Sequence, residues 1–371
     1  MSNLSPRPEI EGMSPYEPGK PVEEITREYN LEQDPVKLAS NENPYSPPDE
    51  LRAVFQDEYS RLNRYPDGGS YYLRKALAEK YDWPAQGIVI GAGSDEIVDF
   101  LAKAFLRPED EVVVADPSFI RHQMLTVMMG ATPVTVPLTD DYRMNLDRML
   151  EVVTDRTRFI CIPNPNNPTS RHVGSEALDE FLTSLPETVT VLLDEAYREF
   201  MDQPDYPDGR SILSRYDSTG PSVVLLRTFS KAYGFAGLRV GYGLMEPERA
   251  TELHKVRPPF NVSRPAQAVA VEALQNDKYV KTARRKISES RSHLLQELRD
   301  RGLEVVPPSA NFMLVGTPEG FDAESFCEAL IKRGVIVRSM APYGLTEHVR
   351  ISVGKPEENN RLLTALDSTL G

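Results

Sequence analysis

Cysteine is scarce in this sequence: Cys161 and Cys327 are the only two among 371 residues. Two cysteines cannot build the disulfide framework that stabilises many secreted domains, so we expect a reducing compartment, the cytoplasm. Histidine is also scarce, and its five residues are scattered over positions 122, 172, 254, 293 and 348. Because no two of them have the short spacing of a metal site, we predict no bound metal.

Positive charge and long apolar runs are lacking as well. The chain has 42 lysines and arginines against 56 acidic residues, a formal net charge of -14. This charge disfavours binding to nucleic acid or an anionic membrane, so an anionic substrate would need local arginines. No apolar run approaches the roughly 20 residues of a membrane helix. The N-terminus, MSNLSPRPEIEG, lacks the basic and apolar pattern of a signal peptide.

Proline is concentrated at the start of the chain. The first 21 residues contain Pro6, Pro8, Pro15, Pro18 and Pro21. Proline lacks an N–H group and cannot continue regular structure, so the segment is predicted to be an extended arm. It could be disordered, or it could wrap over a partner subunit, and composition favours neither alternative.

Strand and helix signals alternate from about residue 70 to about residue 275. Short, nearly continuous apolar runs stand at 87–91, 112–114, 159–162, 189–193 and 223–226. Such runs are typical of strands buried on both faces in a parallel sheet. Ser94, Asp95 and Glu96 precede apolar residues at helical spacing, which predicts a helix start. The segment is predicted to be an α/β domain of the doubly wound kind.

The pattern changes after about residue 280. A charged helix is predicted over 283–301, followed by strands at 311–315, 335–338 and 348–353. In the last strand, the alternation of residues places Arg350 on the face opposite Val349 and Ile351. We predict an N-terminal arm and part of a small domain in 1–45, a large domain in 46–280, and a small α+β domain in 281–371.

Polar residues follow each predicted strand of the large domain. In open α/β sheets, ligands bind at the carboxyl ends of the strands. The five segments that follow the strands are GAGSD (91–95), DPSF (116–119), PNPNNP (163–168), DEAY (194–197) and RTFSK (227–231). They supply a helix N-terminus, an aromatic ring, an amide, an acid with a tyrosine, and a lysine.

This set of groups matches one cofactor, pyridoxal phosphate. Its aldehyde needs an amine, for which Lys231 is the candidate. A buried carboxylate such as Asp194 would keep its pyridine nitrogen protonated. Tyr197 and Asn167 can donate hydrogen bonds to the ring oxygen, and Phe119 can stack on the ring.

The cofactor's phosphate group would lie at the predicted helix start. Ser94 and Asp95 offer backbone N–H groups there. Ser230 and Arg239 can add a hydroxyl and a guanidinium. The sequence therefore predicts a complete phosphate site.

Three motifs in this order, NPNNPT, LLDEAY and TFSKAYGFAGLRVGY, resemble the fold-type I aminotransferases, and the whole chain resembles the histidinol-phosphate aminotransferases among them. Further similar segments are MSPYEPGK, LASNENPYSPP, NRYPDGGSYYLRKALAEKY, GAGSDEIVDFLAKAFL, PFNVSRPAQ, SANFMLV, GVIVRSM and HVRISVG. The resemblance implies a mostly parallel central sheet covered by helices, plus a small α+β domain. It also implies amino transfer between L-histidinol phosphate and 2-oxoglutarate, giving imidazole-acetol phosphate and glutamate in histidine biosynthesis.

The resemblance also implies a role for individual residues. The catalytic residues would be Lys231, Asp194 and Tyr197. The other cofactor-binding residues would be Gly93, Ser94, Asp95, Phe119, Asn167, Thr228, Ser230 and Arg239. Tyr65 would reach the cofactor phosphate of a neighbouring subunit, which implies a homodimer. The substrate would be bound by Tyr16, Asn43, Arg338 and Arg350.

Each assignment has an ordinary structural alternative. A lone lysine is usually exposed, Asp194 could cap a helix, and Asn167 could stabilise a proline-rich turn. The remaining alternatives are core packing for Phe119, an ordinary turn for Tyr65, and solvated strand positions for Arg338 and Arg350. The lysine, acid, amide and arginine in one order favour the cofactor site.

The sequence departs from the family pattern at two positions. His122 stands where a tyrosine is common, which could alter substrate preference, although a histidine there is more often structural. Ser170 replaces the glycine of the usual NPTG motif, and we expect this to change only a turn.

Three alternative functions stay open: an aromatic amino acid aminotransferase, a pyridoxal-phosphate-dependent decarboxylase of a phosphorylated amino acid, and a non-catalytic regulatory or scaffold protein. The presence of Lys231 disfavours the last.

Overall fold

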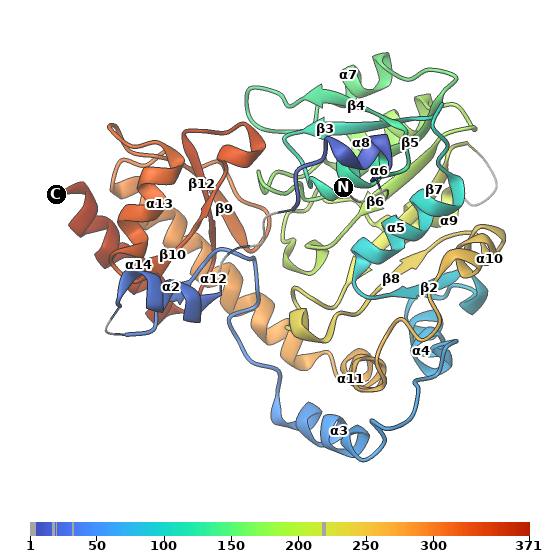
Figure 1. Cartoon of the computed structure of the whole chain (residues 1–371), viewed down its shortest axis with the longest axis horizontal. Coiled ribbons are helices and arrows are strands. Elements are labelled where there is room, and N and C mark those ends of the chain that lie inside the picture. The colour runs from blue at the N-terminus through green and yellow to red at the C-terminus, as the bar shows by residue number, and fades with distance from the viewer. Residues whose placement is uncertain (1–4, 17–18, 20, 32, 217–219) are drawn as a thin grey trace.

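The computed structural model describes residues 5–16, 19, 21–31, 33–216 and 220–371. Seven strands form the central sheet in the order β2-β8-β7-β6-β5-β3-β4 (Figure 1). β8 runs antiparallel to its neighbours β2 and β7, and the other neighbouring strands are parallel. The bounds are β2 Ile88–Gly91, β3 Glu111–Asp116, β4 Thr132–Pro137, β5 Thr157–Pro163, β6 Thr190–Asp194, β7 Ser222–Thr228 and β8 Gly241–Leu244. The predicted α/β fold with a mostly parallel sheet is confirmed.

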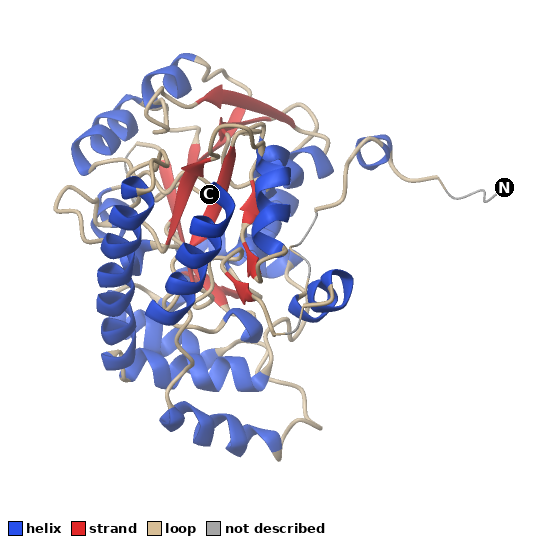
Figure 2. Ribbon diagram, turned by 90° about the vertical axis from the view of Figure 1, so that its left-hand side faces the viewer, coloured by secondary structure: helices blue, strands red, loops and turns tan. Residues whose placement is uncertain are grey.

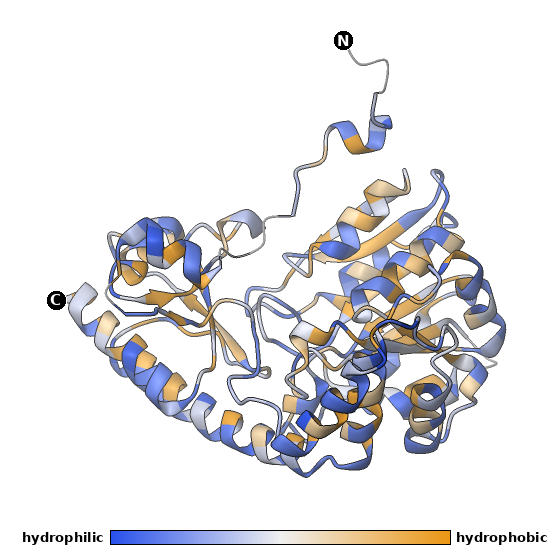
Figure 3. Ribbon diagram, turned by 60° about the horizontal axis from the view of Figure 1, so that its bottom comes forward, coloured by the Kyte–Doolittle hydropathy of each residue, from blue (hydrophilic) through white to orange (hydrophobic). Residues whose placement is uncertain are grey.

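The sheet separates two hydrophobic cores. In β5, Ile160 and Ile162 point into one core, whereas Phe159 and Cys161 point into the other. Adjacent residues of a strand face opposite sides of the sheet, so a strand covered on both sides is apolar throughout. Figure 3 shows these strands as predominantly hydrophobic inside a more hydrophilic set of helices.

Helices cover both faces of the sheet (Figure 2). One core receives α4 (Tyr71–Tyr81), α7 (Leu146–Glu151), α8 (Ser175–Ser184), α9 (Gly209–Arg215) and α11 (Arg264–Gln275). The other receives α5 (Ser94–Phe105), α6 (Arg121–Met128) and α10 (Pro247–Val256). The helix α3 (Asp49–Tyr59) packs against α11. Short 3₁₀ helices are η1 (Ala85–Gly87), η2 (Arg198–Phe200), η3 (Ala236–Leu238) and η4 (Ala341–Tyr343).

Two smaller sheets lie beside the large one. β11 (Arg338–Ser339), β12 (His348–Ser352) and β9 (Phe312–Gly316) form an antiparallel sheet in that order. β1 (Val36–Lys37) pairs in parallel with β10 (Val335–Ile336), so the chain near residue 36 joins this part of the fold. The helices here are α2 (Val22–Tyr29), α13 (Ala323–Ile331) and α14 (Pro356–Leu370). The strand predicted at 335–338 is divided, because β10 pairs with β1 and β11 pairs with β12.

The long helix α12 (Lys278–Asp300) connects the two parts of the fold. The predicted domain limit at residue 280 therefore falls inside its first turn. The part with the seven-stranded sheet is called the large domain below, and the part with the two small sheets is called the small domain. The residue limits at 45 and 280 stay predictions.

The N-terminal arm is not wholly extended. α1 (Pro8–Glu11) forms one helical turn that begins at a proline, a position where the missing N–H costs nothing. Arg7 donates a hydrogen bond to the carbonyl of Met128, at the end of α6. The prediction of an extended arm is therefore wrong at 8–11. Residues 1–4, 17–18 and 20 lie outside the described part of the arm.

Among the described residues, no helix is both long and apolar enough to cross a membrane. Within the same residues, no group of three or more histidines, cysteines and acids is placed to hold a metal ion.

Candidate active site

A cavity of about 220 Å³ opens at the carboxyl ends of the parallel strands, next to the small domain. It is lined by every predicted site residue except Tyr65 and Asn43. These are Tyr16, Gly93, Ser94, Asp95, Phe119, Asn167, Asp194, Tyr197, Thr228, Ser230, Lys231, Arg239, Arg338 and Arg350. Asn41 and Tyr343 also line it, and the sequence prediction missed both. One cavity thus collects the ends of β2, β5, β6 and β7.

Asp194, the last residue of β6, is the buried acid of the cavity. One of its carboxylate oxygens accepts a hydrogen bond of 3.1 Å from the backbone N–H of Ala196. Burial raises the pKa of Asp194 to about 7, and the nearby Asp95 adds to the effect. The charge of Lys231 opposes this shift but does not cancel it, so the described residues leave the carboxylate without a cation that fully stabilises its charge.

His122 is the nearest basic side chain to Asp194. Its Nε2 lies 3.8 Å from Oδ2 of Asp194, and neither ring nitrogen has a hydrogen-bond partner among the described residues. Burial lowers the pKa of His122 to about 4, so the ring is neutral at pH 7. Its ring also meets Phe119 edge to face, with centroids 5.5 Å apart. The sequence alone assigns His122 no chemistry. In the structure, His122 packs against both Asp194 and Phe119, the residue predicted to stack on the cofactor ring.

Lys231 lies three residues beyond the end of β7. Its Nζ donates a 3.1 Å hydrogen bond to the carbonyl of Ser40 and lies 5.6 Å from the ring centroid of Tyr197. Burial, together with the smaller effect of the positive charge of Arg350, lowers the pKa of Lys231 to about 8. A substantial fraction of this amine is therefore neutral near physiological pH.

The opposite end of the cavity is suited to an anion. Ser94 is the first residue of α5, so the free N–H groups of a 12-residue helix point toward the cavity. Arg239 donates to Ser230 Oγ at 3.1 Å and to the carbonyl of Ala92 at 3.2 Å. Gly93 has φ +88°, and a Cβ there would meet Arg239 Nη2 at 2.7 Å. A glycine is thus required for the arginine to approach the helix start.

Asn167 and Tyr197 are held by residues of the N-terminal segment and the small domain. Arg350 donates through Nη1 to Asn167 Oδ1 at 2.6 Å and through Nη2 to the carbonyl of Ala39 at 2.7 Å. Asn41 donates through Nδ2 to the hydroxyl of Tyr197 at 3.1 Å. Burial raises the pKa of Tyr197 to about 12, so its hydroxyl keeps its proton.

A buried ion pair fixes the two strand ends that carry Asp194 and Lys231. Arg227 donates through Nε to Glu195 Oε2 at 2.8 Å, and its Nη2 lies 2.6 Å from the same oxygen. Both side chains are fully buried. Glu195 follows Asp194 and Arg227 precedes Thr228, so the pair ties the ends of β6 and β7 together.

These residues fit pyridoxal phosphate on the structure's own terms. The acid has no strong cationic partner, which a protonated pyridine nitrogen would supply. The amine of Lys231 is near neutrality, as a group that bonds to an aldehyde needs to be. The helix start with Ser230 and Arg239 offers donors for a phosphate.

Two predicted residues lie elsewhere in the single chain. Tyr65 is 78 % exposed and stacks on Phe260, with ring centroids 4.6 Å apart. Asn43 donates through Nδ2 to the carbonyl of Ala232 at 2.8 Å, and Asn41 stands at the cavity instead. The geometry therefore supports Asn41 in place of Asn43 as the asparagine that the N-terminal segment contributes to this cavity.

The chain is similar to known proteins along nearly its whole length. The family "Aminotransferase class I and II" matches residues 33–366. The chain is 42 % identical over 365 residues to histidinol-phosphate aminotransferase 2 of Carboxydothermus hydrogenoformans, covering 98 % of this chain and 99 % of that protein. It is 41 % identical over 365 residues to the histidinol-phosphate aminotransferase of Moorella thermoacetica, covering 98 % and 92 %.

A solved structure of similar fold contains the cofactor. The histidinol-phosphate aminotransferase of Sinorhizobium meliloti in complex with pyridoxal-5'-phosphate superimposes with a TM-score of 0.86 at 28 % identity, covering 100 % of this chain and 98 % of that chain. The aspartate aminotransferase of Thermus thermophilus with maleate gives a TM-score of 0.84 at 23 % identity, covering 100 % of both, and supports the fold alone.

Proposed function

The chain belongs to the class I and II aminotransferases and is a pyridoxal-phosphate-dependent transaminase, and from this premise we propose that it acts on L-histidinol phosphate and 2-oxoglutarate. The products are imidazole-acetol phosphate and glutamate, in histidine biosynthesis. The proposal is supported by relatives of that name at about 40 % identity over nearly the whole chain.

One observation about the site carries the proposal: Arg350 is a buried cation without an anion. Its two hydrogen bonds go to neutral oxygens, and its Nε has no hydrogen-bond partner among the described residues. Burial lowers the pKa of Arg350, and no carboxylate among the described residues forms an ion pair with it. A substrate with a phosphate or carboxylate group would supply the missing charge.

Both proposed substrates carry such a group. Histidinol phosphate presents a phosphate, and 2-oxoglutarate presents carboxylates. The planar guanidinium fork pairs with either oxyanion, so Arg350 and Arg338 can serve both half-reactions. Tyr16 and Tyr343 line the same end of the cavity and are available to contact the rest of the substrate.

The geometry above supports a place for the cofactor in this cavity. When bound, pyridoxal phosphate supplies an aldehyde that accepts the substrate's amine and a ring that withdraws electrons from the substrate carbon. Asp194 would hold a proton at the ring nitrogen, and Tyr197 and Asn167 would hold the ring oxygen. Ser94, Asp95, Thr228, Ser230 and Arg239 would hold the phosphate.

Lys231 performs the proton transfer. Its Nζ, with a pKa lowered to about 8, accepts the proton from the substrate carbon that bears the nitrogen. Arg350 holds the substrate's anionic group. The amine of Lys231 is buried, so water does not compete with the substrate for proton exchange with it. The two groups thus divide binding and proton transfer between the small and the large domain.

The test of this function is a half-reaction assay. Holoenzyme is mixed separately with histidinol phosphate, phenylalanine or tyrosine, and the absorbance of the lysine-bound cofactor is followed. Histidinol phosphate is expected to abolish this absorbance, and added 2-oxoglutarate is expected to restore it with formation of glutamate. A response to phenylalanine alone would identify an aromatic amino acid aminotransferase. Release of CO2 from a phosphorylated amino acid would identify a decarboxylase.

We also propose a homodimer in which Tyr65 enters the partner's cofactor site. Tyr65 does not line the described cavity of its own chain, and it stands on an exposed apolar surface. Tyr65 stacks on the exposed Phe260, and Phe55, Tyr59, Leu62, Tyr71 and Tyr72 are further exposed apolar side chains nearby in the sequence. Exposed apolar patches of this kind mark interaction sites.

The two thiols, Cys161 and Cys327, are free and buried, which supports the cytoplasm as the location.

The shared site predicts complementation between two inactive variants. A homodimer of Tyr65→Ala subunits lacks Tyr65 in both active sites, and a homodimer of Lys231→Ala subunits lacks Lys231 in both. In a mixed dimer, one of the two sites has an intact Tyr65 and an intact Lys231. Subunits unfolded and refolded together at equal amounts are expected to recover up to roughly one quarter of wild-type activity, since half of the dimers are mixed. Activity equal to the mean of the separate variants would contradict the shared site.

A further inference from the structure

Ser170 occupies a position that does more than complete a turn. It is fully buried, and its backbone has φ +61°, the left-handed region that favours glycine. Its N–H donates to the carbonyl of Asn166 at 2.8 Å, within the turn that also carries Asn167. The expectation that Ser170 changes only this turn is wrong, because its side chain also contacts the segment that leads into β9 of the small domain.

The hydroxyl of Ser170 accepts two backbone hydrogen bonds from the segment that leads into β9. The N–H of Ser309 donates to it at 3.0 Å and the N–H of Ala310 donates at 2.8 Å. The N–H of Ser309 also donates a 2.9 Å hydrogen bond to the carbonyl of Ser170, whereas the N–H of Ala310 has the hydroxyl of Ser170 as its acceptor. Ala310 is fully buried, so removal of the hydroxyl leaves a buried N–H without its partner.

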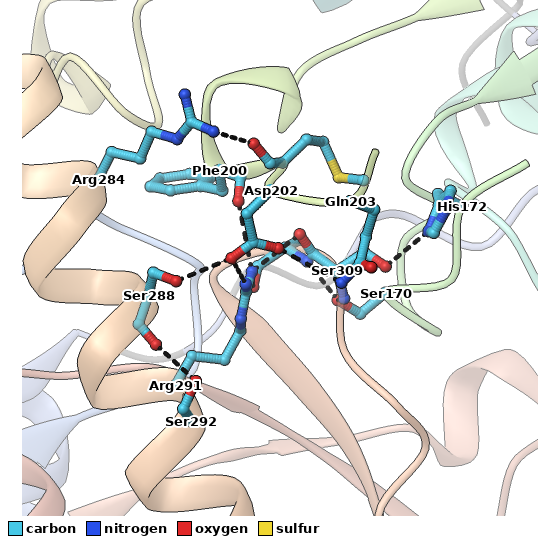
Figure 4. Close-up of polar contacts among 12 residues, drawn as sticks. Ser170, His172, Phe200, Asp202, Gln203, Arg284, Ser288, Arg291, Ser292 and Ser309 are labelled. Atoms are coloured by element: carbon cyan, nitrogen blue, oxygen red, sulfur yellow. Dashed lines mark hydrogen bonds and ion pairs between the residues drawn. The ribbon is translucent and has the colours of Figure 1, made fainter. Parts of the chain in front are cut away.

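Arg291 of α12 holds the same two peptide groups from the other side (Figure 4). Its Nη1 donates to the carbonyls of Ser309 and Ala310 at 3.0 and 3.2 Å. Its Nη2 forms an ion pair with Asp202, which also accepts a 2.8 Å hydrogen bond from Ser288. The segment 309–310 is therefore clamped between α12 and the turn of Ser170.

The clamped segment leads directly to the substrate side of the cavity. Phe312, two residues after Ala310, is the first residue of β9, and its ring contacts both Tyr197 and Arg350. The centroids of Phe312 and Tyr197 are 5.0 Å apart, and the guanidinium carbon of Arg350 lies 5.5 Å from the Phe312 centroid. A shift of segment 309–312 would thus move the support of the substrate-binding arginine.

A second route connects Ser170 to the same arginine. Asn167, three residues earlier in the turn, accepts the 2.6 Å hydrogen bond from Arg350 Nη1. The contacts therefore form a closed circuit that runs from Ser170 through Ser309, Ala310 and Phe312 to Arg350, and back through Asn167. Every member of this circuit is buried.

From this circuit we propose that Ser170 is a positioning residue that sets Arg350 relative to Asn167, and thereby sets the affinity for anionic substrates. It acts through the hydroxyl that fastens the cofactor turn to the small domain. The proposal rests on the proposed function only for the role of Arg350 as the anion-binding residue.

The test compares Ser170→Gly, Ser170→Ala and Ser170→Thr in the holoenzyme. Glycine removes the hydroxyl and relieves the strain of φ +61°, alanine removes the hydroxyl and keeps the strain that serine already has, and threonine keeps the hydroxyl but adds strain through its branched Cβ. We expect KM for both the amino donor and the oxo acid to rise about five- to tenfold in the glycine and alanine variants, the effect of one lost buried hydrogen bond. We expect kcat to change less than about twofold. Threonine is expected to recover KM although its Tm is the lowest of the three.

This order separates positioning from stability. If KM follows Tm, so that threonine is the worst and glycine is near wild type, Ser170 has a structural role only and the proposal fails. Thr169→Val is the matched control, since Thr169 is equally buried in the same turn and its hydroxyl bonds to Asn166 rather than to segment 309–310. It is expected to lower Tm while leaving KM within about twofold.

A fivefold rise of KM in Thr169→Val would also overturn the proposal. If the threonine variant does not fold, the comparison of Ser170→Gly with Thr169→Val decides. KM is measured with whichever amino donor the wild-type enzyme turns over. A failure of histidinol phosphate as donor therefore leaves the Ser170 result readable.

Discussion

Lys231→Ala is expected to lower kcat for either half-reaction by at least about 10³-fold, because it removes both the amine that bonds the cofactor and the general base. The cavity would keep its acid, its helix N-terminus and Arg239, so the variant should still bind pyridoxal phosphate without a covalent bond. Borohydride reduction followed by mass measurement checks this: the wild-type chain should gain the cofactor's mass at Lys231 and the variant should not.

A matched lysine separates this effect from a general loss of charge. Lys286 is exposed, lies 4.8 Å from the ring centroid of Tyr45, and does not line the cavity. Lys286→Ala should retain activity within about twofold and should still be labelled on reduction. Retention of more than about one tenth of wild-type kcat in Lys231→Ala would contradict the assignment of Lys231 as the base.

The strand ends of the large domain could be predicted from sequence because of the sheet's physics. Buried parallel strands such as β5 and β6 are continuous apolar runs, and their polar successors stand out. Two strands lack this signal. β4 is an exposed edge strand interrupted by Pro133 and Pro137, and β8 is the four-residue segment GYGL. A Cβ on Gly241 would lie 2.4 Å from the backbone N of Ser94, so the glycine reflects close approach to α5.

The substrate side of the site was harder to predict, because long-range pairing decides it. Asn41 and Asn43 stand two residues apart, and which of them faces the cavity depends on how β1 pairs with β10. Tyr343 lies in a 3₁₀ helix of three residues, too short for a periodic pattern. The contact of His122 with Asp194 joins α6 to β6 and has no local sequence signal.

Asp194→Asn is expected to lower kcat about 10²- to 10⁴-fold, since an amide cannot hold the ring nitrogen of the cofactor in its charged form. Asparagine keeps the size of the side chain, so the cavity should persist. The absorbance of the bound cofactor should shift, and the thermal stabilisation that the cofactor gives to the wild-type enzyme should shrink in the variant.

The same substitution is expected to stabilise the cofactor-free protein at neutral pH. The pKa of Asp194 is about 7 in the folded chain against 3.8 in the unfolded chain, so the folded state holds the extra proton between about pH 4 and pH 7. Stability from this group is therefore lost as pH rises through that range, and its cost at pH 8 is on the order of 4 kcal/mol. Cofactor-free Asp194→Asn does not bear this cost.

Subtracting the free energy of unfolding of the cofactor-free variant from that of the wild type isolates Asp194 from other titrating groups. This difference should fall from pH 5 to about pH 7, level off above that pH, and be negative at pH 8. His122, whose pKa is lowered to about 4 by burial, titrates in both proteins and largely cancels. If this difference in the free energy of unfolding stays constant from pH 5 to pH 8, ionisation of Asp194 does not destabilise the folded chain. The cofactor's positive charge is then not needed to compensate the carboxylate. The expected slope would instead mean that the fold accepts an unstable carboxylate because the bound cofactor neutralises it.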